Sequence, residues 1–153
     1  MRKRESFLIV AKPGAAGKTT IMGAMLSLRP EEEELVVYSN DTAHKIEKIT
    51  GQKCFVVHEI GSGSWYGYVG NKSAINFLEI PQKNPNLAIA GNLHCDTIDD
   101  IKSLISSFGA SQSLLNNVQL LIFLEFNPKK NPSRKIKEIW HLEHEQHTRI
   151  FSF

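Results

Sequence analysis

The sequence predicts an α/β fold in which a mostly parallel central sheet continues into antiparallel strands at its C-terminal end. Short apolar runs alternate with helical patterns through most of the chain, which is typical of parallel strands joined by crossover helices. The last two runs, 135–142 and 148–153, are joined by a polar turn and therefore indicate a hairpin. A chain of 153 residues is long enough for one domain, and we expect residues 1–153 to form it.

Each element is predicted from its own apolar pattern and end signals. Strands are expected at 7–11, 35–39, 54–59, 75–80, 87–90, 120–126, 135–142 and 148–153. The first helix, 18–28, has one apolar face, and a short second helix is expected within 40–49. A third helix begins at Thr97, which has the spacing of a capping box with Asp100, an aspartate in place of the usual glutamate.

The strongest functional signal lies between the first strand and the first helix. The segment reads Lys12, Pro13, Gly14, Ala15, Ala16, Gly17, Lys18, Thr19 and Thr20. In a phosphate-binding loop, main-chain N–H groups and the helix N-terminus bind phosphate oxygens, a lysine neutralises them, and the next hydroxyl binds Mg²⁺. We therefore predict that residues 13–20 bind the phosphates of ATP, with Lys18 as the cation and Thr19 as a Mg²⁺ ligand.

Two positions depart from the GxxxxGK[ST] pattern of such loops. Lys12 stands at the first glycine position, which is free of strain only if the φ angle of Lys12 is negative. Ala15 replaces a second common glycine, while Gly14 supplies backbone freedom. The alternative interpretation is an ordinary strand–turn–helix junction that binds no ligand.

Hydrolysis of a phosphoanhydride requires an acid that holds the metal at a strand end and a group that orients water. Glu79 ends the apolar run 75–80 and is the first candidate for that acid, holding Mg²⁺ through water. Asp41 is a second candidate and Glu59 a weaker third. His94 follows a predicted core strand, where its side chain could contact a γ-phosphate. Each has a structural alternative: a half-exposed strand glutamate for Glu79, a helix cap for Asp41 and a structural histidine for His94.

Composition argues against several other classes of protein. A net charge of +2 is too small to indicate a nucleic-acid-binding surface. No apolar run approaches the roughly 18 residues that span a bilayer, and no signal peptide is recognisable, so we expect a cytoplasmic protein that does not span a membrane. Cys54 and Cys95 lack paired spacing and are expected to be reduced. His141, His144 and His147 fit a solvated hairpin turn better than a zinc site.

Four stretches, in this order, resemble the RecA-like ATPases of type II and type IV secretion and pilus assembly. Residues 17–20 are similar to the end of the family's Walker A motif, and 75–80 are similar to its Walker B strand. Residues 90–96 resemble its histidine box, and 120–153 resemble its closing strands. The resemblance implies a RecA-like P-loop fold that binds ATP and Mg²⁺, with secretion or pilus machinery or further copies of the chain as partners.

The same resemblance assigns roles to single residues. Lys18 would be the phosphate lysine, Glu79 the Walker B acid and His94 the histidine-box sensor, while Asp41 falls in the family's acidic box. That box reads Asn40-Asp41, without the glutamate thought to activate water. The helix between the Walker B strand and the histidine box looks deleted, and the family's N-terminal domain, which supplies arginines across subunits, has no counterpart. The resemblance is therefore to a truncated or degenerate member, and slow Mg²⁺-dependent ATP hydrolysis is expected.

Two other functions remain open from the sequence. A nucleotide-binding regulatory or assembly module without catalysis would explain Asn40 and Lys12. A small nucleotide kinase fits the chain length and the phosphate loop, but the segment 61–70 contains no arginine that could form a lid over the substrate.

Overall fold

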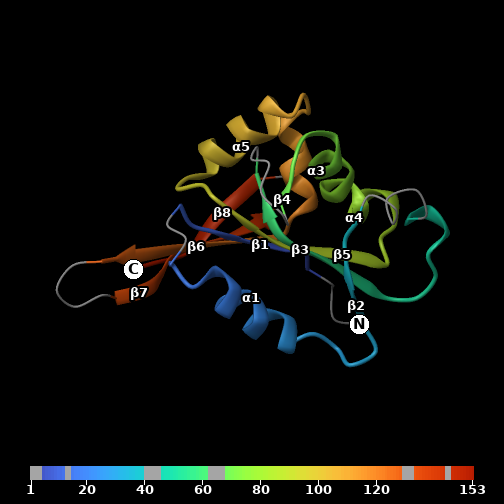
Figure 1. The fold of residues 1–153 in the computed structure, drawn as a ribbon, viewed down its shortest axis with the longest axis horizontal. Coiled ribbons are helices and arrows are strands. Elements are labelled where there is room, and N and C mark those ends of the chain that lie inside the picture. Colours follow the sequence, from blue (N-terminus) through green and yellow to red (C-terminus); the bar gives the residue numbers. More distant parts are fainter. Residues whose placement is uncertain (1–4, 13–14, 40–45, 62–67, 129–132, 144–145) are drawn as a thin grey trace.

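A computed structural model describes residues 5–153, apart from 13–14, 40–45, 62–67, 129–132 and 144–145 (Figure 1). Eight strands among the described residues form one sheet, in the order β2-β3-β5-β1-β6-β7-β8, with β4 paired to β3. The strands are β1 (Phe7–Val10), β2 (Glu34–Val37), β3 (Lys53–Ile60), β4 (Tyr68–Val69), β5 (Leu87–Leu93), β6 (Leu120–Asn127), β7 (Ser133–Glu143) and β8 (Gln146–Ser152). The strands β1 to β6 pair in parallel, whereas β6, β7 and β8 pair antiparallel. The predicted fold class is confirmed.

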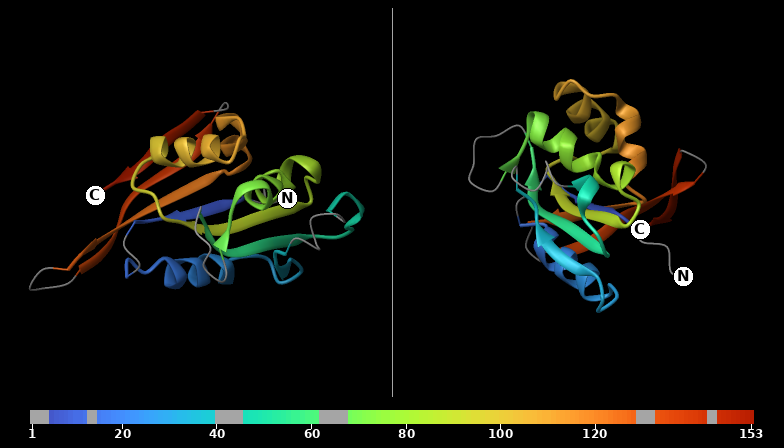
Figure 2. Two further views of the ribbon diagram at one scale, coloured as in Figure 1. Left: turned by 45° about the horizontal axis from the view of Figure 1, so that its top comes forward. Right: turned by 90° about the vertical axis from the view of Figure 1, so that its right-hand side faces the viewer.

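Helices cover both faces of the parallel part of the sheet, with α1 on one face and α3, α5 and η2 on the other (Figures 1 and 2). Their bounds are α1 (Lys18–Ser27), η1 (Ile46–Lys48), α3 (Asn71–Leu78), α4 (Ile80–Lys83), α5 (Ile98–Ser107) and η2 (Gln112–Asn117). No described helix combines the length and the apolar character needed to cross a membrane.

The central strand β1 shows how the two layers arise from one short run. Phe7 and Ile9 pack with Met22 of α1, while Leu8 and Val10 pack into the core beneath α3 and α5. Successive strand side chains point to opposite faces, so a strand covered on both sides must be apolar at every position. All four residues of β1 are buried accordingly.

A glycine in β5 allows two parallel strands to pack closely. A Cβ atom at Gly91 would lie 2.7 Å from Val57 Cγ2 of β3, closer than carbon atoms approach without a shift of the neighbour. The strand that leads to His94 therefore depends on a residue without a side chain.

The predicted strand at 75–80 is wrong, because these residues belong to helices α3 and α4. Ala74, Phe77 and Leu78 have helical spacing and are buried against the core. A short apolar run does not distinguish a strand from a buried helix, and here packing decides for the helix. The inference of a deleted helix before the histidine segment is wrong for the same reason, since α3 and α4 lie there. Glu79 lies at the junction of the two helices.

The helix expected within 40–49 is described only in part. Residues 46–48 form the 3₁₀ turn η1, while Asn40 and Asp41 lie outside the described residues. The histidines expected in a solvated turn are also placed differently where they are described. His141 lies in β7 and the half-buried His147 lies in β8, with its Nε2 2.8 Å from the Val118 carbonyl oxygen.

The capping box at the start of α5 is confirmed. Thr97 Oγ1 accepts a hydrogen bond from the Asp100 N–H at 3.1 Å, and Asp100 Oδ2 accepts from the Thr97 N–H at 3.0 Å. Asp100 Oδ2 also accepts from the Asp96 N–H, and these hydrogen bonds lower the pKa of Asp100. Helix-end N–H groups that no carbonyl can reach are satisfied in this way.

The Thr97→Ala variant should lose about 1 kcal/mol of unfolding free energy, because the cap to the Asp100 N–H disappears. Urea denaturation measures the loss, and Ser107→Ala at the other end of α5 is the control. Since the folded pKa of Asp100 lies below its unfolded value, the stabilisation from its carboxylate is present above the unfolded pKa and is lost as pH falls through the folded pKa. A destabilisation by Asp100→Asn that does not shrink with falling pH would contradict this account.

Candidate nucleotide-binding site

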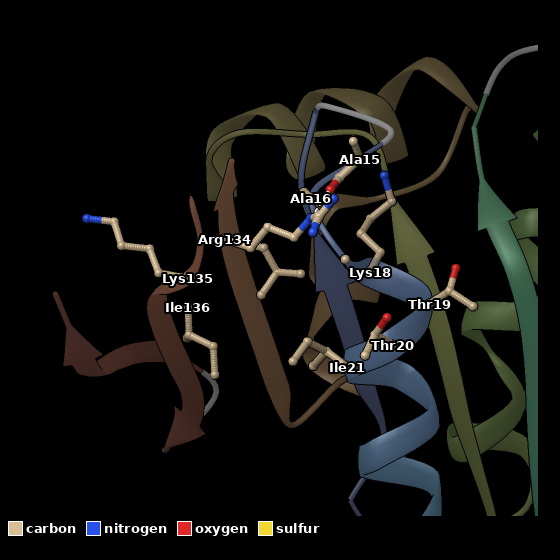
Figure 3. Close-up of a pocket in the computed structure, with 11 residues that line it drawn as sticks. Ala15, Ala16, Lys18, Thr19, Thr20, Ile21, Arg134, Lys135 and Ile136 are labelled. Atoms are coloured by element: carbon tan, nitrogen blue, oxygen red, sulfur yellow. Dashed lines mark hydrogen bonds between the residues drawn. The ribbon is translucent and has the colours of Figure 1, made fainter. Parts of the chain in front are cut away.

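The loop between β1 and α1 has the geometry of an anion site at its helix end. Gly17 precedes α1 with φ 90°, in the left-handed region that favours glycine. No described side chain caps this helix terminus, so its first N–H groups are available to a ligand. A cavity of about 570 Å³ opens beside it (Figure 3). Its lining consists of Ala15, Ala16, Gly17, Lys18, Thr19, Thr20, Ile21, Leu124, Arg134, Lys135 and Ile136.

Lys18 connects this loop to the ends of the neighbouring strands. Its side chain is only 5% exposed, and Nζ donates to the Ala11 carbonyl oxygen at 2.9 Å. Nζ also lies 3.3 Å from His94 Nε2 and 3.8 Å from Glu59 Oε2. Burial lowers the pKa of Lys18, because the ammonium loses water, while Glu59 opposes that shift. The ammonium is therefore held at the base of the loop.

Glu59 is the acidic group of this cluster. It is the penultimate residue of β3 and is buried, and burial raises its pKa against the opposing effects of Lys18 and His94. Its Oε2 lies 3.3 Å from His94 Nε2, while Oε1 is buried without a hydrogen-bond partner among the described residues. A buried carboxylate oxygen without a partner is costly unless a ligand, water or cation contacts it.

His94 is held by contacts on two sides of its ring. Nδ1 lies 2.9 Å from the Lys12 carbonyl oxygen, and the ring stacks on Tyr68 with centroids 6.3 Å apart. A carbonyl oxygen only accepts, so Nδ1 carries the proton and the neutral ring presents Nε2 as an acceptor to Lys18. When protonated, Nε2 instead donates toward Glu59. Nε2 therefore lies between the Lys18 ammonium and the Glu59 carboxylate.

Lys12 occupies the first glycine position of the motif without backbone strain. Asn71 is the only non-glycine residue with positive φ among those described, so Lys12 is not in the left-handed region. Its Nζ pairs with Asp96 Oδ2 at 3.2 Å, and this contact raises the pKa of Lys12. The lysine at this glycine position therefore connects the loop to the start of α5.

The structure brings together some of the predicted site residues and separates others. Lys18 and His94 meet, and residues 15–20 surround the helix end. Glu79 does not join them: it pairs with Lys83 at 2.7 Å and lines a separate cavity between α3 and η2. The acid beside Lys18 is Glu59, the weakest of the three sequence candidates.

Pro13, Gly14 and Asp41 lie outside the described residues. Glu59 has a sequence signal of its own, since it follows the run Cys54-Phe-Val-Val, whose β-branched valines favour a strand. Sequence reasoning missed Arg134, whose Nε donates to the Ala15 carbonyl oxygen at 2.6 Å. No pattern near Arg134 indicates that contact, because the two residues are 119 positions apart. Within the described part of the chain, no group of three or more histidine, cysteine or acidic side chains could hold a metal by itself.

Comparison with known proteins gives matches only among solved structures. No protein-family model matches the sequence, and no curated protein matches it. The VirB11 ATPase of the Brucella suis type IV secretion system, in complex with sulphate, has a TM-score of 0.61 at 13% identity. That match covers 90% of this chain and 48% of VirB11. The chain has the fold of the secretion ATPases.

A second match supports the same fold. The Legionella pneumophila ATPase DotB has a TM-score of 0.60 at 14% identity, over 92% of this chain and 47% of DotB. The chain thus spans about half the length of either ATPase. The resemblance to secretion ATPases is confirmed as a likeness of fold.

Proposed function

We propose that this protein binds ATP together with Mg²⁺ and hydrolyses it slowly. The observation that carries the proposal is the convergence of Lys18, Glu59 and His94 at the end of the loop that begins α1. Glu59 lies near the end of β3, His94 directly follows β5, and Lys18 begins α1 after the loop that leaves β1. All three therefore lie at the edge where open parallel sheets bind ligands. The shared fold with VirB11 and DotB, both described as ATPases, supports the proposal.

The loop supplies the phosphate contacts. The N–H groups at the start of α1 donate to phosphate oxygens, and the positive end of the helix favours their charge. Lys18 turns its ammonium from the Ala11 carbonyl to the phosphates, which exchanges a neutral partner for a charged one. Hydrophobic strands on both sides keep the site rigid.

The residues present fit a Mg²⁺ ion. The Thr19 hydroxyl lies at the exposed start of α1, and the buried Oε1 of Glu59 has no partner among the described residues. Hydroxyl and carboxylate oxygens are the ligands that Mg²⁺ accepts, commonly through water. When bound, the ion neutralises charge that develops on the phosphate oxygens.

Glu59 takes the role that the sequence assigned to Glu79. A carboxylate beside Lys18 can hold a water that coordinates Mg²⁺ or orient the attacking water, whereas Glu79 faces another cavity. With both ring nitrogens protonated, His94 would donate from Nε2 to the terminal phosphate and from Nδ1 to the Lys12 carbonyl oxygen, which links the phosphate to the loop. Asp41 stays a sequence prediction, as do the cytoplasmic location and the partners: secretion or pilus machinery, or further copies of the chain.

Binding and turnover are to be measured separately. Titration calorimetry with ATP, with and without Mg²⁺, tests binding, and release of inorganic phosphate tests hydrolysis. Binding strengthened by Mg²⁺ together with slow phosphate release is the expected result. Binding of ATP without release of phosphate would contradict the ATPase proposal and favour a non-catalytic nucleotide-binding module. Transfer of phosphate to added nucleosides or nucleotides instead of water would identify a kinase, and no binding at all would refute every nucleotide-based function.

A further inference from the structure

The loop has catalytic groups on one side and an open cavity on the other. In the sheet order, β3 and β5 lie on one side of β1 and β6 and β7 on the other. Glu59 and His94 belong to the first side, whereas Leu124, Arg134 and Ile136 line the cavity from the second. A nucleotide whose terminal phosphate binds Lys18 would extend its α-phosphate and ribose toward β6 and β7, away from the Glu59 carboxylate.

Arg134 is the cation best placed on that second side. Figure 3 shows its side chain reaching from β7 to Ala15 and Ala16, whereas Lys135 points away from the loop. Arg134 Nε donates to the Ala15 carbonyl oxygen at 2.6 Å, and its guanidinium carbon lies 5.3 Å from the centroid of the Phe126 ring. Stacking on an aromatic face holds the guanidinium plane in one orientation.

The other N–H groups of Arg134, on Nη1 and Nη2, could bind a ligand. Among the residues that the structure describes, none accepts a hydrogen bond from Nη1 or Nη2. A guanidinium presents two parallel N–H groups that match two oxygens of a phosphate. Its Cδ would be 3.5 Å from a Cβ at Gly17, so the side chain lies directly against the turn that starts α1.

We propose that Arg134 is a nucleotide-binding arginine supplied by the same chain, and that it binds the α-phosphate. The inference rests on the proposed binding of ATP in this loop. Without nucleotide, the Ala15 carbonyl holds the guanidinium beside the cavity. With nucleotide, the Nη donors bind the α-phosphate. A cis arginine at this place would supply positive charge from within the chain.

The location of the contact predicts how affinity changes among nucleotides. Because ADP and ATP share the α-phosphate, loss of an arginine bound to it should lower the affinity for both nucleotides by the same factor. Loss of an arginine bound to the terminal phosphate would instead weaken the binding of ATP more than that of ADP. Removing a hydrogen bond between charged groups should reduce affinity about 10- to 100-fold.

Titration calorimetry with Mg-ADP and Mg-ATP on the whole chain tests this inference. Arg134→Gln should weaken both nucleotides by at least about ten-fold and by similar factors, and Arg134→Lys should give a smaller loss because the charge remains without the planar fork. Arg149→Gln is the matched control, because Arg149 belongs to β8, lies over the Trp140 ring and does not line the cavity. This control should change either affinity by less than about two-fold.

Circular dichroism and thermal melting show whether each variant is folded. If Arg134→Gln does not fold, the affinities of Arg134→Lys for the two nucleotides test the inference. Unchanged affinities in a folded Arg134 variant would overturn the inference, and so would a loss confined to ATP. In both cases the wild-type protein still binds nucleotide, so the proposed function stands. A wild-type chain that binds neither nucleotide refutes the proposed function itself.

Discussion

Replacing Lys18 by alanine should remove detectable binding of ATP. Its ammonium is the cation at the base of the loop, 2.9 Å from the Ala11 carbonyl oxygen, and a phosphate would bind it in preference to that neutral partner. The methyl side chain of alanine cannot neutralise the phosphate, which would then lie without a counter-ion in a site shielded from water. We expect the affinity for Mg-ATP to fall at least about 100-fold, in the range of a lost charge-assisted hydrogen bond. Titration calorimetry measures the change.

Lys83→Ala is the matched control for the Lys18 variant. Lys83 is also a lysine paired with a glutamate, Glu79, but it lies on α4, away from the loop. Its replacement should leave ATP affinity within about two-fold of the wild type. Equal affinities of the Lys18 variant and the wild type would show that nucleotide, if bound, does not occupy this loop.

The second large effect is expected for Glu59→Gln, which should retain nucleotide binding and lose hydrolysis. Glutamine keeps the size and one acceptor of the side chain but removes the charge beside Lys18 and His94. The rate of phosphate release should fall at least about 100-fold, the usual contribution of a positioned acid or base. Single-turnover phosphate release at saturating Mg-ATP separates this loss from any change in affinity.

The Glu79→Gln variant tests whether the acid required for hydrolysis is Glu59, which the structure places beside Lys18, or Glu79, which the sequence pattern predicted. Because Glu79 pairs with Lys83 at 2.7 Å and faces a different cavity, its replacement should change hydrolysis by less than about two-fold. The opposite ranking, with Glu79→Gln inactive and Glu59→Gln active, would return the metal-binding role to Glu79.

The pH dependence of hydrolysis gives an independent check on Glu59. Burial raises the pKa of this carboxyl, so the group takes up a proton at a higher pH than an exposed glutamate does. The carboxylate form is the one that can hold a Mg²⁺-bound water. Wild-type hydrolysis should therefore decrease as pH falls through that raised pKa, while the residual rate of Glu59→Gln should lack this step. An identical pH profile in both proteins would exclude Glu59 as the titrating group.

The local features of this protein could be predicted from its sequence. The parallel sheet with a terminal hairpin, the loop that ends in Gly17 and Lys18, and the capping box of Thr97 were all predicted and are present in the structure. The loop and the capping box depend on residues within a few positions of one another, and the strands were predicted from local periodicity. The resemblance to secretion ATPases came from four local stretches and holds for the fold, although the stretch 75–80 is helical and not the expected Walker B strand.

The choice of distant residues that meet at the loop could not be predicted in this way, because it depends on how the strands are arranged in the sheet. The runs before Glu59 and Glu79 both read as an apolar segment followed by an acid, but Phe77 and Leu78 pack as a helix and carry Glu79 away. Glu59 reaches Lys18 because β5 pairs in parallel with both β3 and β1 and so brings the ends of these strands to the same edge of the sheet. Arg134 reaches Ala15 across 119 positions because β7 pairs with β6, which pairs with β1. Strand order and burial are properties of the whole chain, since they depend on which apolar faces cover one another, and no local pattern encodes that choice.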